Sequence, residues 1–337
     1  MINISKNKDL KEYNTFNLSC KAEQFVEFDK PEYIQKYLES EHHKNSKHFV
    51  LGGGSNVLFS DKYDGTIFYS SIKGISIITN SDDCVLVKIG SGVVWDDFVK
   101  FAVTNNFYGT ENLSLIPGNI GASAVQNIGA YGVEAKDLIQ KIEYIEIESA
   151  KLKEIENSDC NYAYRDSIFK HELQNKVIIT NVYYKLSKLT KFKLDYGNLI
   201  DVLADKEHTL LNVRNAVIET RQTKLPDTEK YGNAGSFFKN PIVDKSIFVR
   251  IQNQYPNMPH FALADDKVKI PTGWLIDTAG WKDKGNERVG VYKNQALVII
   301  NKGNATSNDI VEFYKSIQKD IFTKFGITIE PEVIFVD

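Results

Sequence analysis

Two hydrophobic periods alternate over the first part of the chain. Residues 24–29 (QFVEFD) have the pattern of a strand, residues 31–40 open on a proline and have helical spacing, and residues 48–52 (HFVLG) resemble a second strand. Proline is favoured at the first position of a helix because its missing N–H would have no partner there. The pattern predicts a small α/β unit at the N-terminus.

Strand patterns dominate the next part of the chain, with one amphipathic helix among them. The apolar runs are 66–69, 74–78 and 84–92, followed after the helix by 141–148 and 177–186. Residues at helical spacing share one face in that helix, namely Trp95, Phe98, Val99, Ala102 and Val103. A stripe of this kind predicts a helix packed on a core.

The last third of the chain has the pattern of a separate unit. A helix-like segment at 208–222 and a turn-rich break (LPDTEKYGNAG) place a domain boundary near 205–222. Helices are then expected at 244–254 and within TGWLIDTAG, and a strand within QALVIIN.

The C-terminal segment carries a helix start signal. Thr306 and Asp309 have the spacing of a capping box, and apolar residues then recur at intervals of three and four positions. The apolar positions are Ile310, Phe313, Tyr314, Ile317, Ile321 and Phe325. We expect a closing strand over 327–336 (ITIEPEVIFV).

Glycine and small residues crowd the stretch from Leu115 to Gly132 (LIPGNIGASAVQNIGAYG). Glycine is unfavourable in helices and strands because it loses extra backbone entropy, so we expect irregular backbone here. Unobstructed N–H groups beside Asn119, Gln126 and Asn127 suit an anionic, hydrogen-bonding ligand such as a dinucleotide. A long structural loop with tight turns is the equally weighted alternative.

A second glycine-rich turn, GGGSN at 52–56, directly follows a predicted strand. It lacks the third glycine of the dinucleotide fingerprint, and no Lys-Ser/Thr pair follows it as in an ATP-type phosphate loop. Two interpretations stay open: a phosphate-binding turn of another kind, or a plain turn.

Composition excludes several classes of function. The 337 residues are 42% hydrophobic and 25% charged, which is typical of a globular protein of two or three domains. A net charge of −3 without a basic cluster argues against a nucleic-acid partner. No apolar run has the length of a membrane span or a secretory signal, so we expect a cytoplasmic protein. The three cysteines and the isolated histidines lack metal-ligand spacing, so no metal is expected.

Three polar constellations are candidates for chemistry. Arg165 in YAYRDSIFK is either a surface ion pair with Asp166 or a donor fork for a carboxylate. Ser236 in GNAGSFFKNP follows a glycine turn and precedes two phenylalanines, so it is either a cap or a hydroxyl in a dry site. Glu330 and Glu332 should project to one face of the closing strand, unless Pro331 breaks its pleat; taken alone, both would be surface charges.

Six motifs then coincide in the order and approximate spacing of one enzyme family. They are GGGSNVLF, LIPGNIGASAVQNIGAYGVE, YRDSIFK, RQTKLPD, GNAGSFFKNP and EPEV, and the match runs from about Asn14 to the C-terminus. On these motifs the chain resembles the UDP-N-acetylenolpyruvoylglucosamine reductase (MurB) family. LDYGNL, with Tyr196, resembles the substrate-capping loop of its type I branch. Relatives often differ at Trp281 and Tyr292, so contacts near 281–292 are left open.

The resemblance implies an α+β fold. It consists of a flavin-binding fold of the p-cresol methylhydroxylase and vanillyl-alcohol oxidase type in two subdomains, followed by an α+β substrate-binding domain. The subdomains are expected at 1–72, completed by a strand at 326–337, and at 73–205, with the substrate domain at 206–325. The implied activity is NADPH-dependent reduction of an enolpyruvyl UDP-sugar through FAD. A monomer is expected.

The resemblance also implies what individual residues do. Arg165 and Glu332 would stabilise the enolate, Glu332 in protonated or hydrogen-bonding form, and Ser236 would protonate it. FAD contacts are expected from Gly52, Gly53, Gly54, Ser55, Asn56, Pro117, Gly118, Gly121, Ser123, Gln126, Asn127, Gly129, Ala130 and Tyr131. Substrate contacts are expected from Tyr196, Lys224, Asn240 and Gln295.

FAD should be bound non-covalently. Some flavoenzymes of this fold attach it through His or Cys, yet no histidine lies between His48 and His171, and only Cys84 falls in that interval. Two other functions stay open: an FAD-dependent alcohol or hydroxy-acid oxidase, and a flavin- or nucleotide-binding regulatory module without turnover.

Overall fold

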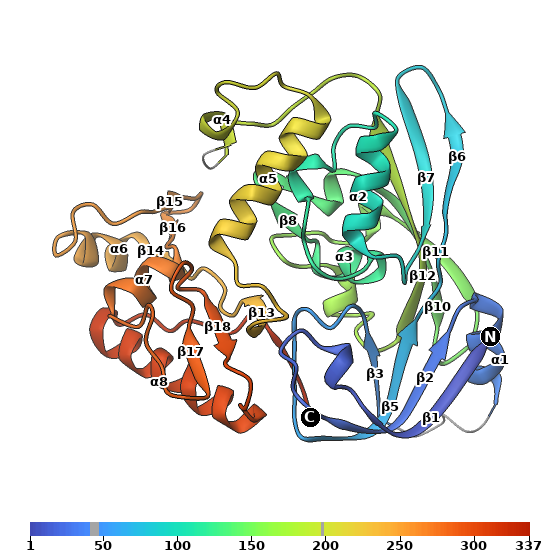
Figure 1. Ribbon diagram of the computed structural model, residues 1–337, viewed down its shortest axis with the longest axis horizontal. Helices are drawn as coiled ribbons and strands as arrows, with labels where there is room; N and C mark the ends of the chain where they lie inside the picture. The colour runs from blue at the N-terminus through green and yellow to red at the C-terminus, as the bar shows by residue number, and fades with distance from the viewer. Residues whose placement is uncertain (41–46, 197–198) are drawn as a thin grey trace. The chain divides into compact units, whose positions relative to one another are not determined.

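The computed structural model describes residues 1–40, 47–196 and 199–337, and its chain forms two compact units (Figure 1). Unit 1 comprises Met1–Lys8, Ala22–Gly53 and Asp64–Arg221, and unit 2 comprises Asp9–Lys21, Gly54–Tyr63 and Gln222–Asp337. Gly197 and Asn198 of the predicted capping loop lie outside the described residues, whereas Tyr196 is described. The division into three domains stays a prediction.

A four-stranded sheet with one helix forms the N-terminal part of unit 1. Its order is β1 (Ile2–Asp9), β2 (Lys21–Phe28), β5 (Lys62–Ser70), β3 (His48–Leu51). Helix α1 (Pro31–Glu39) buries Ile34, Tyr37 and Leu38, and β3 pairs with β5 in parallel. The predicted strand, helix and strand are confirmed, while β1 was not predicted because its exposed pattern lacks a hydrophobic face.

A five-stranded antiparallel sheet forms the second layer of unit 1. Its order is β11 (Leu152–Glu156), β10 (Ile139–Glu146), β12 (Val177–Ser187), β7 (Cys84–Gly90), β6 (Ile75–Asn80). Helices α2 (Trp95–Thr104) and α3 (Ile120–Gln126) lie on one side of this sheet (Figure 1). The Trp95 ring packs 5.7 Å from that of Tyr184, and the predicted apolar stripe of α2 is buried, as expected.

Unit 1 also contains two short strands and two helices outside these two sheets. They are β8 (Gly129–Ala130), β9 (Val133–Glu134), α4 (Leu199–Val202) and α5 (Leu210–Lys224), whose last residues are counted with unit 2. Among the described residues, no helix combines the length and apolarity that a membrane crossing requires.

Unit 2 is built around small sheets and a long helix. One sheet has the order β13 (Gly232–Ser236), β18 (Val298–Asn301), β17 (Val289–Val291), another β14 (Ile242–Asp244), β16 (Lys267–Lys269), β15 (Phe261–Ala262). Its helices are α6 (Lys245–Gln252), α7 (Thr272–Thr278) and α8 (Ser307–Phe325). The predicted capping box of Thr306 and Asp309 is present at the start of α8, and all six predicted apolar positions of α8 are buried.

The expected closing strand is much shorter than predicted. Only β19 (Ile334–Val336) forms, pairing in parallel with β4 (Val57–Phe59). Residues 327–333 are irregular apart from a bridge between Pro331 and Phe238, so Glu330 and Glu332 do not share the face of a strand. Pro331 has no N–H to donate, which prevents a continuous ladder through this point.

The glycine-rich stretch contains a helix that the sequence analysis did not expect. Helix α3 spans Ile120–Gln126 because the Asn119 side chain caps it, accepting from the N–H of Ala122 at 3.1 Å. Asn127 ends it in the left-handed conformation, with φ of 47°. The prediction of irregular backbone was wrong here, since packing of buried Ile120 and Ala124 outweighs the low helix propensity of Gly121.

Candidate active site

The two glycine-rich turns of the sequence meet in unit 1. A Cβ added to Gly53 would lie 2.6 Å from the Cα of Gly118, and one added to Gly52 would lie 2.7 Å from the Cβ of Ala122. Only glycine permits so close an approach of two backbones. Segments far apart in the sequence therefore form one surface. Gly54, Ser55 and Asn56 continue the turn and are counted with unit 2.

An ion pair holds the start of the long glycine-rich stretch. Leu115 has a φ of +58°, unusual for a branched side chain, and its N–H donates to Oδ1 of Asp96 at 2.6 Å. Arg214 on α5 donates to both oxygens of Asp96, at 2.8 and 2.7 Å. Burial alone would raise the pKa of Asp96, but these donors outweigh it and lower the pKa below its ordinary value.

Several predicted cofactor contacts have side chains occupied within the protein. The hydroxyl of Ser123 contacts the Ile120 carbonyl and the Tyr184 hydroxyl, each at 2.6 Å. The buried Asn127 amide donates to the Ala163 carbonyl at 2.8 Å, while Oε1 of Gln126 accepts from Lys170 at 3.0 Å. These side chains hold the conformation of the segment. A ligand would therefore be bound by the backbone of the segment.

Arg165 is directed at this segment and is not paired with its neighbour. Its Nη2 donates to the carbonyl of Gly129 at 2.5 Å, and its own φ is +56°. The guanidinium also lies 5.2 Å from the Tyr164 ring centre. Asp166 instead contacts His171, at 2.8 Å. The fork interpretation of Arg165 is therefore favoured over an ion pair with Asp166.

Ser236 and Glu332 belong to two backbone segments of unit 2 that are hydrogen-bonded to each other. The N–H of Glu332 donates to the carbonyl of Phe237 at 2.8 Å, which sets Glu332 beside the end of β13. Gly235 turns the chain there with φ of +67°. Phe237 is fully buried whereas Ser236 is exposed, so the expected dry surroundings of Ser236 are absent within unit 2.

The predicted substrate contacts are divided between the units. Lys224, Asn240 and Gln295 belong to unit 2 and Tyr196 to unit 1. Oδ1 of Asn240 accepts from the N–H of Thr272 at 2.9 Å at the start of α7, so its NH₂ is the group it can offer. Tyr196 is 52% exposed, and Lys224 is exposed.

Three charged residues escaped the sequence analysis. Asp96 and Arg214 look like ordinary helix surface charges, and Arg221 lies in the RQTKLPD motif without having been singled out. Arg214 and Arg221 are two turns apart, so they fall on one face of α5. This spacing is the sequence signal from which Arg214 and Arg221 could have been identified.

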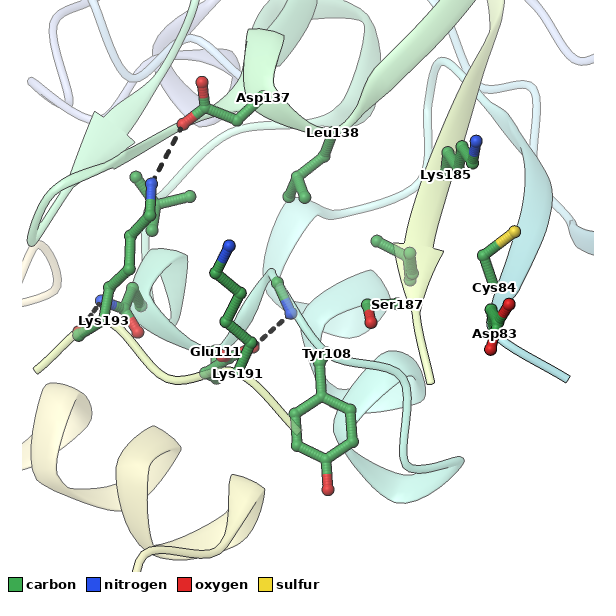
Figure 2. Close-up of a pocket in the computed structure, with 14 residues that line it drawn as sticks. Asp83, Cys84, Tyr108, Glu111, Asp137, Leu138, Lys185, Ser187, Lys191 and Lys193 are labelled. Atoms are coloured by element: carbon green, nitrogen blue, oxygen red, sulfur yellow. Dashed lines mark hydrogen bonds and ion pairs between the residues drawn. The ribbon is translucent and has the colours of Figure 1, made fainter. Parts of the chain in front are cut away.

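A separate cavity of about 350 Å³ lies in unit 1 (Figure 2). The described lining comes from Asp83, Cys84, Tyr108, Gly109, Glu111, Asn112, Val133, Asp137, Leu138, Lys185, Leu186, Ser187, Lys191 and Lys193. The predicted site residues are not among these described residues. Burial raises the pKa of Glu111, whose carboxylate accepts from the N–H of Gly109 at 2.7 Å. Lys193 faces Asp137 at 3.8 Å, as Figure 2 shows.

Comparison with known proteins first defines the class. Residues 22–155 match the FAD binding domain family, and residues 227–336 match the C-terminal domain of UDP-N-acetylenolpyruvoylglucosamine reductase. A crystal structure of that reductase from Thermus caldophilus superposes with a TM-score of 0.70 over 100% of this chain and 99% of its own, at 18% identity. The expected flavin-binding fold followed by a second domain is confirmed.

Two relatives then define the family. The reductase of Flavobacterium johnsoniae is 47% identical over 98% of both chains, and that of Porphyromonas gingivalis is 40% identical over 99% of this chain and all of its own. The chain belongs to the UDP-N-acetylenolpyruvoylglucosamine reductase family. It is therefore a flavoenzyme oxidoreductase of peptidoglycan-precursor synthesis.

Proposed function

We propose that this chain reduces the enolpyruvyl ether of UDP-N-acetyl-enolpyruvoylglucosamine to UDP-N-acetylmuramate, with NADPH as the reductant and non-covalent FAD as the carrier. The observation that supports the residue assignment is the backbone hydrogen bond between Glu332 and Phe237, which brings the chain at Glu332 beside the residue that follows Ser236 on β13. A reductase of this type needs such a combination, because it must both stabilise and protonate a carbanion.

The backbone surface of unit 1 suits FAD. Gly53 lies against the backbone of Gly118 and Gly52 against the Cβ of Ala122, and the neighbouring polar side chains are occupied internally. Main-chain N–H groups of these two turns would hold the diphosphate and the ring. FAD, when bound, accepts hydride from NADPH and supplies it to the substrate.

Side chains of the protein would stabilise the charge that develops on the substrate and would supply the proton. Hydride addition at C3 of the enolpyruvyl group puts negative charge on C2 and on the adjacent carboxylate. The Arg165 fork and Glu332 would stabilise this charge, a task for which the loss of one donor typically costs about 3 to 4 kcal/mol of barrier. Ser236 would donate its proton to C2, and its exposure in unit 2 leaves its hydroxyl accessible.

The decisive experiment separates the two half-reactions under anaerobic conditions. NADPH should bleach the yellow holoenzyme, and the enolpyruvyl sugar nucleotide should restore its colour. In Ser236→Ala the bleaching should be unchanged while recolouring slows roughly 10²- to 10⁴-fold. Ser316→Ala, which removes an exposed hydroxyl on α8, serves as the control and should match the wild type.

Other outcomes point to the alternatives. Recolouring by oxygen alone would indicate an oxidase. An unchanged rate in Ser236→Ala would remove this residue from the mechanism, and absence of recolouring in the wild type would favour a module without turnover. Yellow colour in an acid-precipitated pellet would contradict non-covalent FAD. The monomeric state and the cytoplasmic location stay predictions.

A further inference from the structure

One buried amide joins the glycine-rich stretch to the segment that carries Tyr196. Asn112 is 1% exposed. Its Nδ2 donates to the carbonyl of Tyr131 at 2.8 Å and to the carbonyl of Lys193 at 2.7 Å. Both protons of this amide are therefore used to hold together two stretches of backbone that are far apart in the sequence.

These two donations leave one polar atom of the same side chain unsatisfied. The Oδ1 of Asn112 is inaccessible to solvent and has no hydrogen-bond partner among the residues that the structure describes. Turning the amide over would not help, because its oxygen would then face two carbonyl oxygens. A leucine of similar size would leave no acceptor unpaired. The asparagine is therefore explained by the two carbonyls that it bridges and not by packing in the core.

The backbone that Asn112 holds has an unusual conformation. Tyr131 has a φ of 48°, which is uncommon for residues other than glycine, and Gly132 follows with a φ of 80°. Such a conformation persists only where the surrounding structure fixes it. Asn112 is one of the groups that fix this end of the glycine-rich stretch.

The side chain of Lys193 makes a second connection between the same two segments. Its Nζ donates to the carbonyl of Gly132 at 3.4 Å and lies 3.8 Å from a carboxylate oxygen of Asp137, toward which it extends in Figure 2. Lys193 is exposed, so each of these contacts is weak by itself. They act in the same direction as the buried amide.

These connections set the start of the Tyr196 side chain over the glycine-rich stretch. A Cβ added to Gly132 would lie 3.5 Å from the Cβ of Tyr196. Phe192 and Leu194 pack, together with Tyr131, against one apolar cluster shared by α4 and α5. The segment 191–196 is thus docked along its length, while the Tyr196 side chain stays half exposed and within reach of a ligand.

We propose that Asn112 and Lys193 are positioning residues, which dock the segment 191–196 on the segment 129–132 and thereby hold Tyr196 where it contacts the sugar nucleotide. Neither residue touches the substrate in this arrangement. Both act through Tyr196, so the proposal rests on the substrate contact that the proposed function assigns to that tyrosine.

The test compares Asn112→Leu with a matched variant, Asn157→Leu. The Nδ2 of Asn157 also donates to two backbone carbonyls of unit 1, those of Lys136 and Ile139, at 2.9 and 2.8 Å. Neither carbonyl belongs to the two docked segments. Both variants lose two hydrogen bonds of the same kind, and only one of them loses the proposed docking.

Two quantities are measured on oxidised holoenzyme with FAD in excess. One is the rate at which chymotrypsin cleaves after Phe192, followed by mass spectrometry. The other is the affinity for the enolpyruvyl sugar nucleotide, followed by perturbation of the flavin spectrum. Neither measurement requires turnover, so a failure of the proposed reaction would not be mistaken for a failure of the docking.

Asn112→Leu should speed the cleavage and weaken nucleotide binding, each roughly tenfold, because two hydrogen bonds that favour the docked segment are lost. Asn157→Leu should match the wild type in both measurements. In a Tyr196→Ala background, Asn112→Leu should cause no further loss of affinity, since its effect passes through Tyr196.

Three results would overturn the proposal. They are equal behaviour of Asn112→Leu and Asn157→Leu, faster cleavage with unchanged affinity, and a further loss of affinity in the Tyr196→Ala background. If Asn112→Leu does not fold, Lys193→Met decides by the same criteria against Lys191→Met, which removes an exposed lysine two residues earlier. If the wild type binds no sugar nucleotide, the proposed function fails, and the cleavage rates alone support or overturn the docking.

Discussion

The two units present their candidate functional groups in opposite ways. In unit 1 the charged groups are held by the protein: Arg165 by the Gly129 carbonyl, and Asp96 by Arg214. In unit 2 Ser236 is exposed at the end of a strand, and the backbone of Glu332 is hydrogen-bonded to Phe237, the next residue along the chain. Unit 1 thus has the preorganised polar surroundings that suit a permanent cofactor, and unit 2 offers groups that a passing substrate can reach.

This contrast predicts that changes at the glycine-rich surface of unit 1 alter flavin binding, whereas changes in unit 2, or elsewhere in unit 1, alter turnover or stability alone. The proton-donor variant Ser236→Ala carries the largest expected effect and tests the unit 2 half of the comparison. The four variants that follow test the rest, in order of decreasing expected effect.

Asp96→Asn should produce the largest effect in unit 1. The substitution removes the negative charge with which Arg214 pairs, and it weakens the hydrogen bond that the Leu115 N–H donates. Breaking a buried pair costs about 3 to 5 kcal/mol, and the partial exposure of Asp96 reduces this to about 2 kcal/mol. Urea unfolding and FAD titration should both respond. Asp97→Asn, one residue along on the exposed face of α2, is the control; equal behaviour of the two variants would contradict the prediction.

The Asp96 contribution should also depend on pH. The folded pKa of Asp96 is below its unfolded value of about 3.9. Its contribution to stability is therefore complete above that unfolded value and is lost as pH falls through the folded pKa. The stability gap between wild type and Asp96→Asn should close in acid; a gap that widened in acid would reverse the assigned sign.

Two helix caps allow a matched comparison between the units. Asn119 caps α3 in unit 1 and Thr306 caps α8 in unit 2. Replacement of either by alanine should cost about 1 kcal/mol of unfolding free energy. Only Asn119→Ala should also weaken FAD binding, because α3 forms part of the proposed flavin surface. A similar loss of FAD affinity in Thr306→Ala would remove the distinction between the units.

Glu111→Gln should change stability least, and it should stabilise the protein where the other variants destabilise it. Burial raises the folded pKa of Glu111, so wild-type stability is lost as pH rises from the ordinary value through the folded one. The amide keeps an acceptor for the Gly109 N–H and carries no charge. Thermal melting should show a small stabilisation at pH 7 that disappears near pH 4, with FAD affinity unchanged. Destabilisation at pH 7 would show that the carboxylate is needed.

Local patterns in the sequence were enough for several elements. The stripe of α2 and the capping box of α8 predicted both helices, because amphipathic spacing and end signals depend on neighbouring residues only. The motifs likewise indicated the family, and with it the flavin, before any contact was known. Local propensity misled at α3, where capping and buried packing outweighed glycine.

What only the tertiary structure decided concerns residues far apart in the chain. It set Glu332 beside Phe237, directed Arg165 toward Gly129 while Asp166 contacts His171, and left the Nε of Arg221 without a hydrogen-bond partner among the residues that the structure describes. The sequence by itself determined which helices and motifs this protein has, since their signals are local. Which charges face each other, and which lack a partner, follows from long-range packing that no local pattern encodes.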